Sequence, residues 1–168
     1  TFAVVSGKIS FHLIISTLIV VAMWHRDLVE SDRQWELRES ELKFRSIFDN
    51  SVDAIGVSRD GLHIMVNPAY VRMFGYQPSE NLAGSSILGL LAPPERAKVQ
   101  KYVRRRAAGE DVPVAYETRG LRSDGSEFDL EVNVSTYELD GKVYTVPMLR
   151  DITERKQTQD ALRTSEAR

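Results

Sequence analysis

Cysteine is absent from this sequence of 168 residues. Its absence excludes disulfides, thiolate metal sites, cysteine nucleophiles and any photochemistry that requires a cysteine adduct. An excess of one charge is also lacking, because 22 basic residues stand against 24 acidic ones, and no overall field favours nucleic acid as a partner. The histidines are His12, His25 and His63, which lie too far apart for a metal-binding spacing, so we predict no metal site.

Motifs of known catalytic sites are missing too. The chain has no Gly-x-Ser-x-Gly, no phosphate-binding loop and no His-Glu-x-x-His, so we predict no catalytic residue in it. The basic run 95–106 ends in Arg104, Arg105 and Arg106, where positive charge complements the dipole of a helix end. We interpret this run as a solvated helix face. The alternative is a surface that binds nucleic acid or an acidic ligand.

A long apolar run is present over residues 9–24, broken only by His12 and small hydroxyl side chains. We predict that residues 1–26 form a transmembrane helix with Trp24 at the membrane interface. No signal-peptide cleavage signature is found near residues 20–24, so we expect the anchor to be retained. Basic residues after the run outnumber Lys8, which places the following residues in the cytoplasm. The alternative is a buried or partner-covered helix.

Residues 27–48 are typical of a linker helix. Leu28, Trp35 and Leu42 recur every seven residues, a spacing that favours pairing with a second copy of the same helix. We therefore predict a homodimer with these three residues in the contact. The alternative is an amphipathic helix that lies on its own domain.

Residues 49–152 carry the signals of a globular domain. Two apolar runs joined by Asp60-Gly61 predict a hairpin. Three more strands are predicted at 112–122, 127–139 and 142–150. Between these two groups of strands we predict three helices. One begins after the N-cap Asn67 with Pro68 in its first turn, a second begins at Pro78 and ends at Gly84, and a longer one covers 93–108. This segregation predicts an α+β domain with helices on one face of a five-stranded antiparallel sheet.

The segments FRSIFDNSVDAIGVSRDGLHIMVNPAYVRMFGY, RSDGSEFDLEVNVS and RDITERK, in this order and spacing, resemble PAS domains (the PAS/PAC sensory boxes of bacterial signalling proteins). The resemblance covers about residues 40–156. It implies the sheet order 2-1-5-4-3 and a cavity between the sheet and the helices. Pro147 departs from the pattern, since it would lie in a central strand and cannot donate to the ladder. We therefore expect a bulge there or a later start of the last strand.

The resemblance also bears on cofactors. Haem-binding relatives carry a proximal histidine on the long helix, where this chain has Val99, and light-sensing flavin relatives need a cysteine. We therefore expect neither a haem of the proximal-histidine type nor a flavin that forms a cysteine adduct. The sequence does not identify a ligand for the cavity. The candidate ligand-binding residues are Tyr70, Phe74, Val99, Tyr116, Phe128 and Thr145, with Ile55, Met65 and Leu91 as further wall candidates. We favour the tyrosines and the threonine because a buried hydroxyl needs a partner that a ligand could supply.

The polar tail 153–168 contains few apolar side chains, which predicts a signalling helix that is stabilised by a twin chain or by a further domain. In similar domains the Asp-x-Thr corner is the signalling joint, which here means Asp151 and Thr153. The segments 162–168 and 37–43 are alike, so the further domain is expected to be another PAS domain.

The resemblance implies the sensory part of a bacterial signalling protein, and the predicted anchor places it in the inner membrane with the PAS domain in the cytoplasm. We predict a two-component histidine kinase. The alternatives are a diguanylate cyclase or phosphodiesterase, and a passive dimerisation spacer without a ligand.

Overall fold

The computed structural model describes residues 23–24, 33–77, 80 and 82–166. The predicted transmembrane helix at 1–26, apart from Met23 and Trp24, lies outside these residues, and so does Leu28 of the predicted dimer contact. Within the described part of the chain, no helix combines the length and the apolar character needed to cross a membrane. The chain divides into two compact units, 1–46 and 47–168.

The described residues of the first unit are helical, and the helical residues described from 33 onward continue to residue 50. An ion pair one turn apart, Lys43 with Glu39 at 2.7 Å, supports this helix by about 0.3–0.5 kcal/mol. Trp35 and Leu42 are 73% and 61% exposed. Their contact with a second copy stays a prediction.

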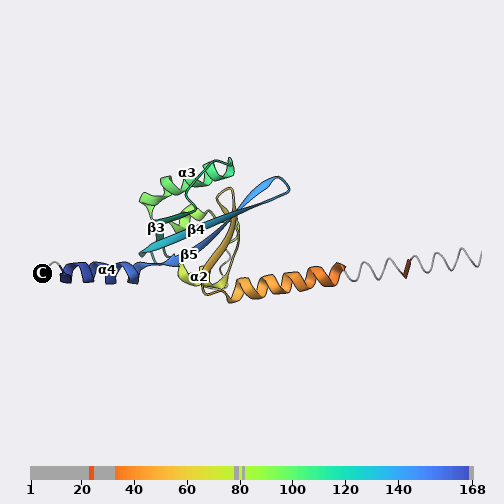
Figure 1. The fold of residues 1–168 in the computed structure, drawn as a ribbon, viewed down its shortest axis with the longest axis horizontal. Coiled ribbons are helices and arrows are strands. Elements are labelled where there is room, and N and C mark those ends of the chain that lie inside the picture. Colours follow the sequence, from red (N-terminus) through yellow and green to blue (C-terminus); the bar gives the residue numbers. More distant parts are fainter. Residues whose placement is uncertain (1–22, 25–32, 78–79, 81, 167–168) are drawn as a thin grey trace, which may run out of the picture. The chain divides into compact units, whose positions relative to one another are not determined.

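The second unit contains a five-stranded sheet (Figure 1). The strands are β1 (Ala54–Arg59), β2 (Leu62–Val66), β3 (Ala115–Leu121), β4 (Glu127–Leu139) and β5 (Lys142–Asp151). Their order is β2-β1-β5-β4-β3, and every neighbouring pair is antiparallel. The predicted fold class and strand order are confirmed. β3 starts later than residue 112, the predicted start.

Two tight turns set the register of the hairpins. Asp60 and Gly61 have φ of 54° and 79°, and Asp140 and Gly141 have φ of 51° and 68°. Positive φ at both central residues is the geometry of type I′ turns, whose twist matches that of the flanking strands. The hairpin predicted at Asp60-Gly61 is confirmed, and Asp140-Gly141 forms the same kind of turn between β4 and β5.

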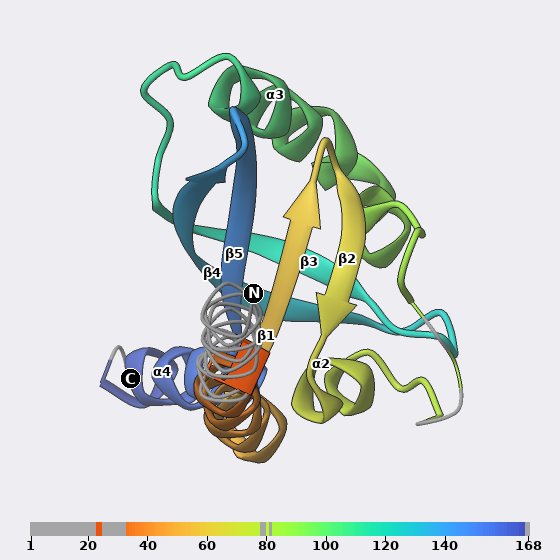
Figure 2. The ribbon, with the colours of Figure 1, turned by 90° about the vertical axis from the view of Figure 1, so that its right-hand side faces the viewer.

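The helices of this unit are α2 (Pro68–Met73), η1 (Ile87–Leu90), η2 (Pro93–Glu95), α3 (Arg96–Ala107) and α4 (Thr153–Glu166). α3 lies near the β1–β2 turn, and α2 lies near the opposite end of these strands (Figure 2). α4 follows directly on β5 and projects away from the globular body rather than folding back onto it (Figure 1).

The helix predicted after Pro78 is wrong for the described residues of that segment. Glu80 and Leu82 have no helical structure, and a turn follows them. The reason is a competing set of hydrogen bonds along the edge of β2. The N–H of Gly84 donates to the carbonyl of His63 at 2.8 Å, and the N–H of His63 donates to the carbonyl of Ser85 at 2.9 Å. Residues 84–86 therefore run along the edge of β2 instead of continuing a helix.

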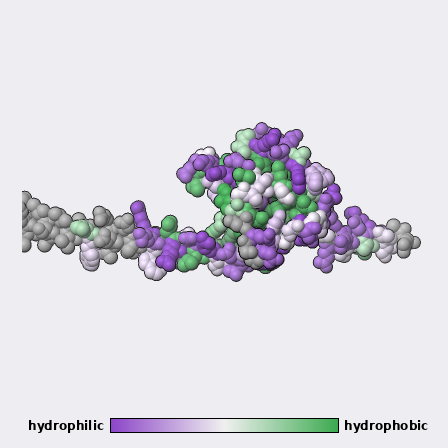
Figure 3. Space-filling view, turned by 180° about the vertical axis from the view of Figure 1, so that it is seen from behind, coloured by the Kyte–Doolittle hydropathy of each residue, from purple (hydrophilic) through white to green (hydrophobic). Residues whose placement is uncertain are grey.

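The core lies between the inner face of the sheet and the helices. On β4 the side chains of Phe128, Leu130 and Val132 are buried, as the period-two pattern predicted. They pack with Phe74, which is 1% exposed. On the molecular face seen in Figure 3, hydrophobic residues gather in the globular body, whereas α4 is mostly hydrophilic.

Pro147 causes neither a bulge nor a late strand start, so that prediction is wrong. β5 begins at Lys142 and keeps one register against β4, with Pro147 opposite Val134. Against β1 the pairs Ile55–Met148 and Ser58–Thr145 share one register, but no pair is formed between them. Pro147 has no N–H to donate, and the ladder between β1 and β5 is interrupted at its position. The Pro147 ring lies close to Gly56, where a larger residue would collide with Tyr70.

Candidate functional site

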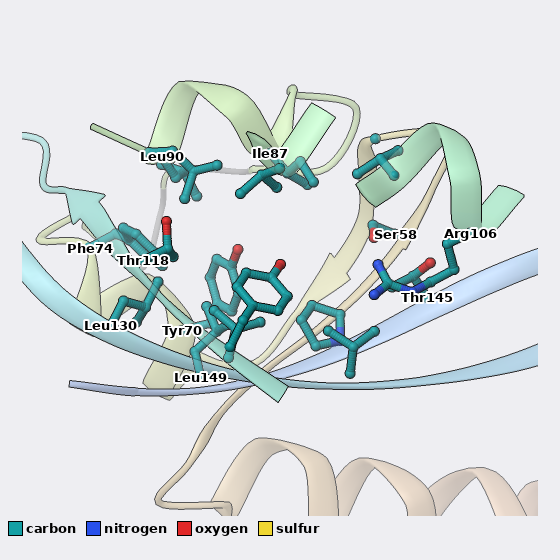
Figure 4. Close-up of a pocket in the computed structure, with 18 residues that line it drawn as sticks. Ser58, Tyr70, Phe74, Ile87, Leu90, Arg106, Thr118, Leu130, Thr145 and Leu149 are labelled. Carbon is teal, nitrogen blue, oxygen red and sulfur yellow. The ribbon is translucent and has the colours of Figure 1, made fainter. Parts of the chain in front are cut away.

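A cavity of about 60 Å³ lies between the inner face of the sheet and the helices (Figure 4). One end is walled by apolar side chains, among them Phe74, Leu90 and Leu130. A water molecule needs about 10–15 Å³ on this scale, so the cavity holds about four to six water-sized groups. Sites for organic cofactors typically measure about 300–1,000 Å³. In this conformation the cavity suits a very small ligand.

The structure brings most of the predicted cavity residues together. Those that line the cavity are Tyr70, Phe74, Leu91, Val99, Tyr116 and Thr145. Phe128, Ile55 and Met65 are not among the lining residues of the described chain, and for them the prediction is wrong. Phe128 instead fills the space over Gly120 and stacks edge-on against Phe74, with ring centroids 5.5 Å apart. Successive side chains of a strand point to opposite faces of the sheet. The partly buried side chains of Ile55 and Met65 are not on the face that lines the cavity.

Tyr70 has a protein partner, which sequence reasoning missed. Its hydroxyl lies 3.0 Å from Nε2 of His63, and Nδ1 of His63 lies 3.1 Å from the carbonyl oxygen of Ser85. Because a carbonyl only accepts, Nδ1 carries the proton and the Tyr70 hydroxyl donates to Nε2. Burial lowers the pKa of His63 and raises that of Tyr70. The expectation that a ligand would satisfy Tyr70 is therefore corrected.

The other end of the cavity is polar. Ser58, Arg106 and Thr145 lie close together there (Figure 4). Arg106 is 9% exposed, so the predicted solvated face is wrong for this residue, although it holds for the exposed Arg104. Val99 lies seven residues before Arg106, and this spacing returns to the same face of a helix. The seven-residue spacing from Val99 is the sequence feature that could have predicted the burial of Arg106.

Asn67 connects the start of the domain to the cavity. The side chain is 0% exposed and caps α2 by accepting from the N–H of Tyr70 at 2.9 Å, as predicted. It also accepts from the N–H of Ile55 at 3.0 Å. Its amide nitrogen donates to the carbonyls of Phe48 and Asp53, at 3.1 and 2.9 Å. One buried amide thus fixes the end of the incoming helix, β1 and α2 relative to one another.

The predicted joint, Asp151 and Thr153, lies where β5 passes into α4. Asp151 Oδ1 accepts from the N–H of Thr153 at 3.0 Å, and Oδ2 accepts from Arg122 Nη2 at 2.6 Å. Arg122 also donates through Nη1 to the carbonyl of Met73 in α2. Burial of the Asp151 carboxyl alone would raise its pKa, but hydrogen bonds from Thr153 and Arg122 outweigh burial and hold the pKa below its ordinary value.

The first turn of α4 is fastened to the sheet. Ile152, which is 2% exposed, donates its N–H to the carbonyl of Asp129 at 2.9 Å. Thr153 Oγ1 accepts from the N–H of Asp129 at 3.0 Å. Lys156 lies 2.9 Å from Asp129 and 2.8 Å from Glu117. The joint is therefore rigid at its base, while the rest of α4 extends into solvent.

The described residues contain no metal-binding cluster, that is, no group of three or more histidine, cysteine, aspartate or glutamate side chains that could hold a metal ion.

Comparisons with known proteins agree with this geometry. A family model described as the PAS fold matches residues 42–152. The chain is 28% identical over 140 residues to Sensor protein FixL of Bradyrhizobium diazoefficiens, covering 80% of this chain and 28% of that protein. It is 31% identical over 155 residues to Hybrid signal transduction histidine kinase B of Dictyostelium discoideum, covering 89% of this chain and 8% of that protein. The chain thus spans less than a third of either relative.

Among solved structures, the chain is similar to the PAS domain of an HTR-like protein from Haloarcula marismortui. The TM-score is 0.60 at 29% sequence identity. The match covers 73% of this chain and 99% of that domain.

Proposed function

Because the chain belongs to the PAS family, we propose that it is the sensory and signal-transmitting module of a membrane-anchored histidine kinase. In this proposal the contents of the cavity set the position of α4, and α4 passes that position to a further domain of the parent protein. The observation that carries the proposal is an unbroken series of contacts from the cavity to the base of α4.

The series of contacts begins at α2. Phe74 lines the cavity and forms the C-cap of α2. The preceding carbonyl, that of Met73, accepts from Arg122, whose other nitrogen holds Asp151. Asp151 in turn holds the first N–H of α4, that of Thr153. A ligand that favours one position of α2 therefore favours one position of α4, in proportion to its differential affinity for the two states.

The remaining parts of the proposal concern the flanking segments. Residues 1–26 anchor the protein in the bacterial inner membrane, and the PAS domain lies in the cytoplasm. The linker helix predicted at 27–48 pairs with a second copy, which would cover the exposed Trp35 and Leu42. α4 leads to the output domain, directly or through another PAS domain.

Spin labels test the relay. The chain has no cysteine, so Arg104→Cys on α3 and Ala161→Cys on α4 introduce two unique attachment sites on exposed positions. Pulsed electron–electron resonance should give a narrow distance distribution in the parent chain and a broad one after Arg122→Met. The matched control is Arg150→Met, which removes a surface ion pair with Asp53 and should leave the distribution narrow. An unchanged distribution in Arg122→Met would contradict the relay.

The kinase assignment is tested on the full-length parent protein. Incubation with labelled ATP should yield an acid-labile, base-stable phosphohistidine. Formation of a cyclic dinucleotide from GTP instead would refute the kinase assignment while leaving the relay intact.

A further inference from the structure

Arg106 is a buried charge without a carboxylate partner in the described part of the chain. It is 9% exposed, and its hydrogen bond there runs from Nη2 to the carbonyl of Pro113 at 2.9 Å. The nearest acidic side chain in sequence, Glu110, pairs with Arg105 at 2.7 Å instead. Buried charges in proteins are normally paired, because desolvation of an unpaired ion is costly. A guanidinium has five N–H donors, so most of the hydrogen-bonding capacity of Arg106 is unused by described residues.

Three hydroxyls share the cavity with this guanidinium. Ser58, Tyr116 and Thr145 line it. Ser58 is 4% exposed, so this end of the cavity is largely shielded from bulk solvent. Burial raises the pKa of Tyr116, and the charge of Arg106 opposes this rise, which is consistent with their shared end of the cavity. One cation and three hydroxyls therefore line the same cavity, and a ligand with acceptor oxygens would satisfy all of them.

The opposite end of the cavity determines the rest of a ligand. Away from Arg106 the lining includes Leu90 and Leu130, and Ile87 and Val99 add further aliphatic groups to the cavity wall. The volume of about 60 Å³ corresponds to about four to six water-sized groups. An acceptor-rich head of one negative charge and a short aliphatic body meet both requirements. Arginine binds a planar carboxylate through two parallel hydrogen bonds, which a neutral head group does not match.

We propose that the cavity binds a short-chain aliphatic monocarboxylate, with its carboxylate against Arg106, Ser58 and Thr145 and its alkyl chain toward Leu90. This assignment rests on the proposed sensory function and names the class of ligand that the cavity recognises.

Titration of the full chain with sodium propionate, followed by saturation-transfer NMR, tests the assignment. Propionamide has nearly the same shape without the charge and is the neutral probe. Propionate should bind saturably, and propionamide should bind roughly tenfold more weakly or not at all. Arg106→Met should weaken propionate binding by roughly tenfold or more, because hydrogen bonds to charged groups are lost. The matched control, Arg105→Met, removes the neighbouring exposed pair and should bind like the parent chain.

A second variant decides the outcome if Arg106→Met fails to fold by circular dichroism. Thr145→Val keeps the shape of the side chain and removes one donor, so it should weaken propionate binding several-fold. Absence of propionate binding, equal binding of propionamide, or unchanged affinity in both cavity variants would overturn the carboxylate assignment. None of these results depends on α4, so they leave the spin-label test of the relay to be judged separately.

Discussion

Replacement of Asn67 by alanine should be among the most costly single changes in the domain. The substitution removes a helix cap, worth about 1 kcal/mol. It also removes the hydrogen bonds that this side chain makes with the N–H of Ile55 and with the carbonyls of Phe48 and Asp53. Each of these hydrogen bonds contributes about 1 kcal/mol. The expected loss in free energy of unfolding is therefore about 3–5 kcal/mol, a large share of the roughly 5–15 kcal/mol typical of a domain.

Urea denaturation of the chain, followed by far-ultraviolet circular dichroism, measures this loss. Asn67→Asp should be no better than alanine, because the new carboxylate faces two carbonyls that need donors. Asn67→Ser keeps an acceptor for the N–H of Tyr70 and should recover about 1 kcal/mol. The control Ser86→Ala removes the cap of η1, an exposed hydrogen bond of 3.3 Å, and should cost at most about 1 kcal/mol. If Asn67→Ala cost no more than Ser86→Ala, the proposed role of Asn67 would be wrong.

Three further outcomes are expected. Gly120→Ala should cost about 1–3 kcal/mol in a urea titration, because its Cβ would lie 2.4 Å from the ring of Phe128, whereas Gly89→Ala, with nothing within 4 Å, should be nearly neutral. The Asp151 carboxyl has a lowered pKa in the folded state, so its stabilisation should be complete above the ordinary value of 3.8 and lost as pH falls below it. Acid titration should therefore show the stability difference between the parent chain and Asp151→Asn shrinking below about pH 4. Trp35→Glu should shift sedimentation velocity from dimer to monomer, and a parent chain that sediments as a monomer would contradict the proposed pairing.

The strands were predictable because local signals specified them. The alternation in 127–139 gives β4 its bounds, and the Asp-Gly turns set the register of the neighbouring strands. Pairings between side chains were not predictable in this way. His63 and Tyr70 are joined only after β2 and α2 have folded together. Periodicity reports which face of an element is buried, but it does not report which polar groups meet on that face.

Arg106 illustrates the limit of the sequence signal for the site. Three consecutive arginines at a helix end favour solvent exposure on average, because buried charges are costly. The helical phase set by Val99 is a competing signal, and here it places the third arginine inward. A charge rule and a periodicity rule disagreed at this position. Such a disagreement between local rules is what a ligand-binding role of Arg106, as proposed above, would produce.

The two ends of α2 explain how a small cavity can affect both flanking helices. At its N-terminus, Asn67 binds the carbonyl of Phe48, which belongs to the last turn of the incoming helix. At its C-terminus, the carbonyl of Met73 binds Arg122, which holds the base of the outgoing helix through Asp151. α2 has only six residues and presents Tyr70 to the cavity between these two attachments. In the proposed relay, a displacement at Tyr70 acts on both attachments of α2. Loosening either attachment should then uncouple the cavity from the helix on that side.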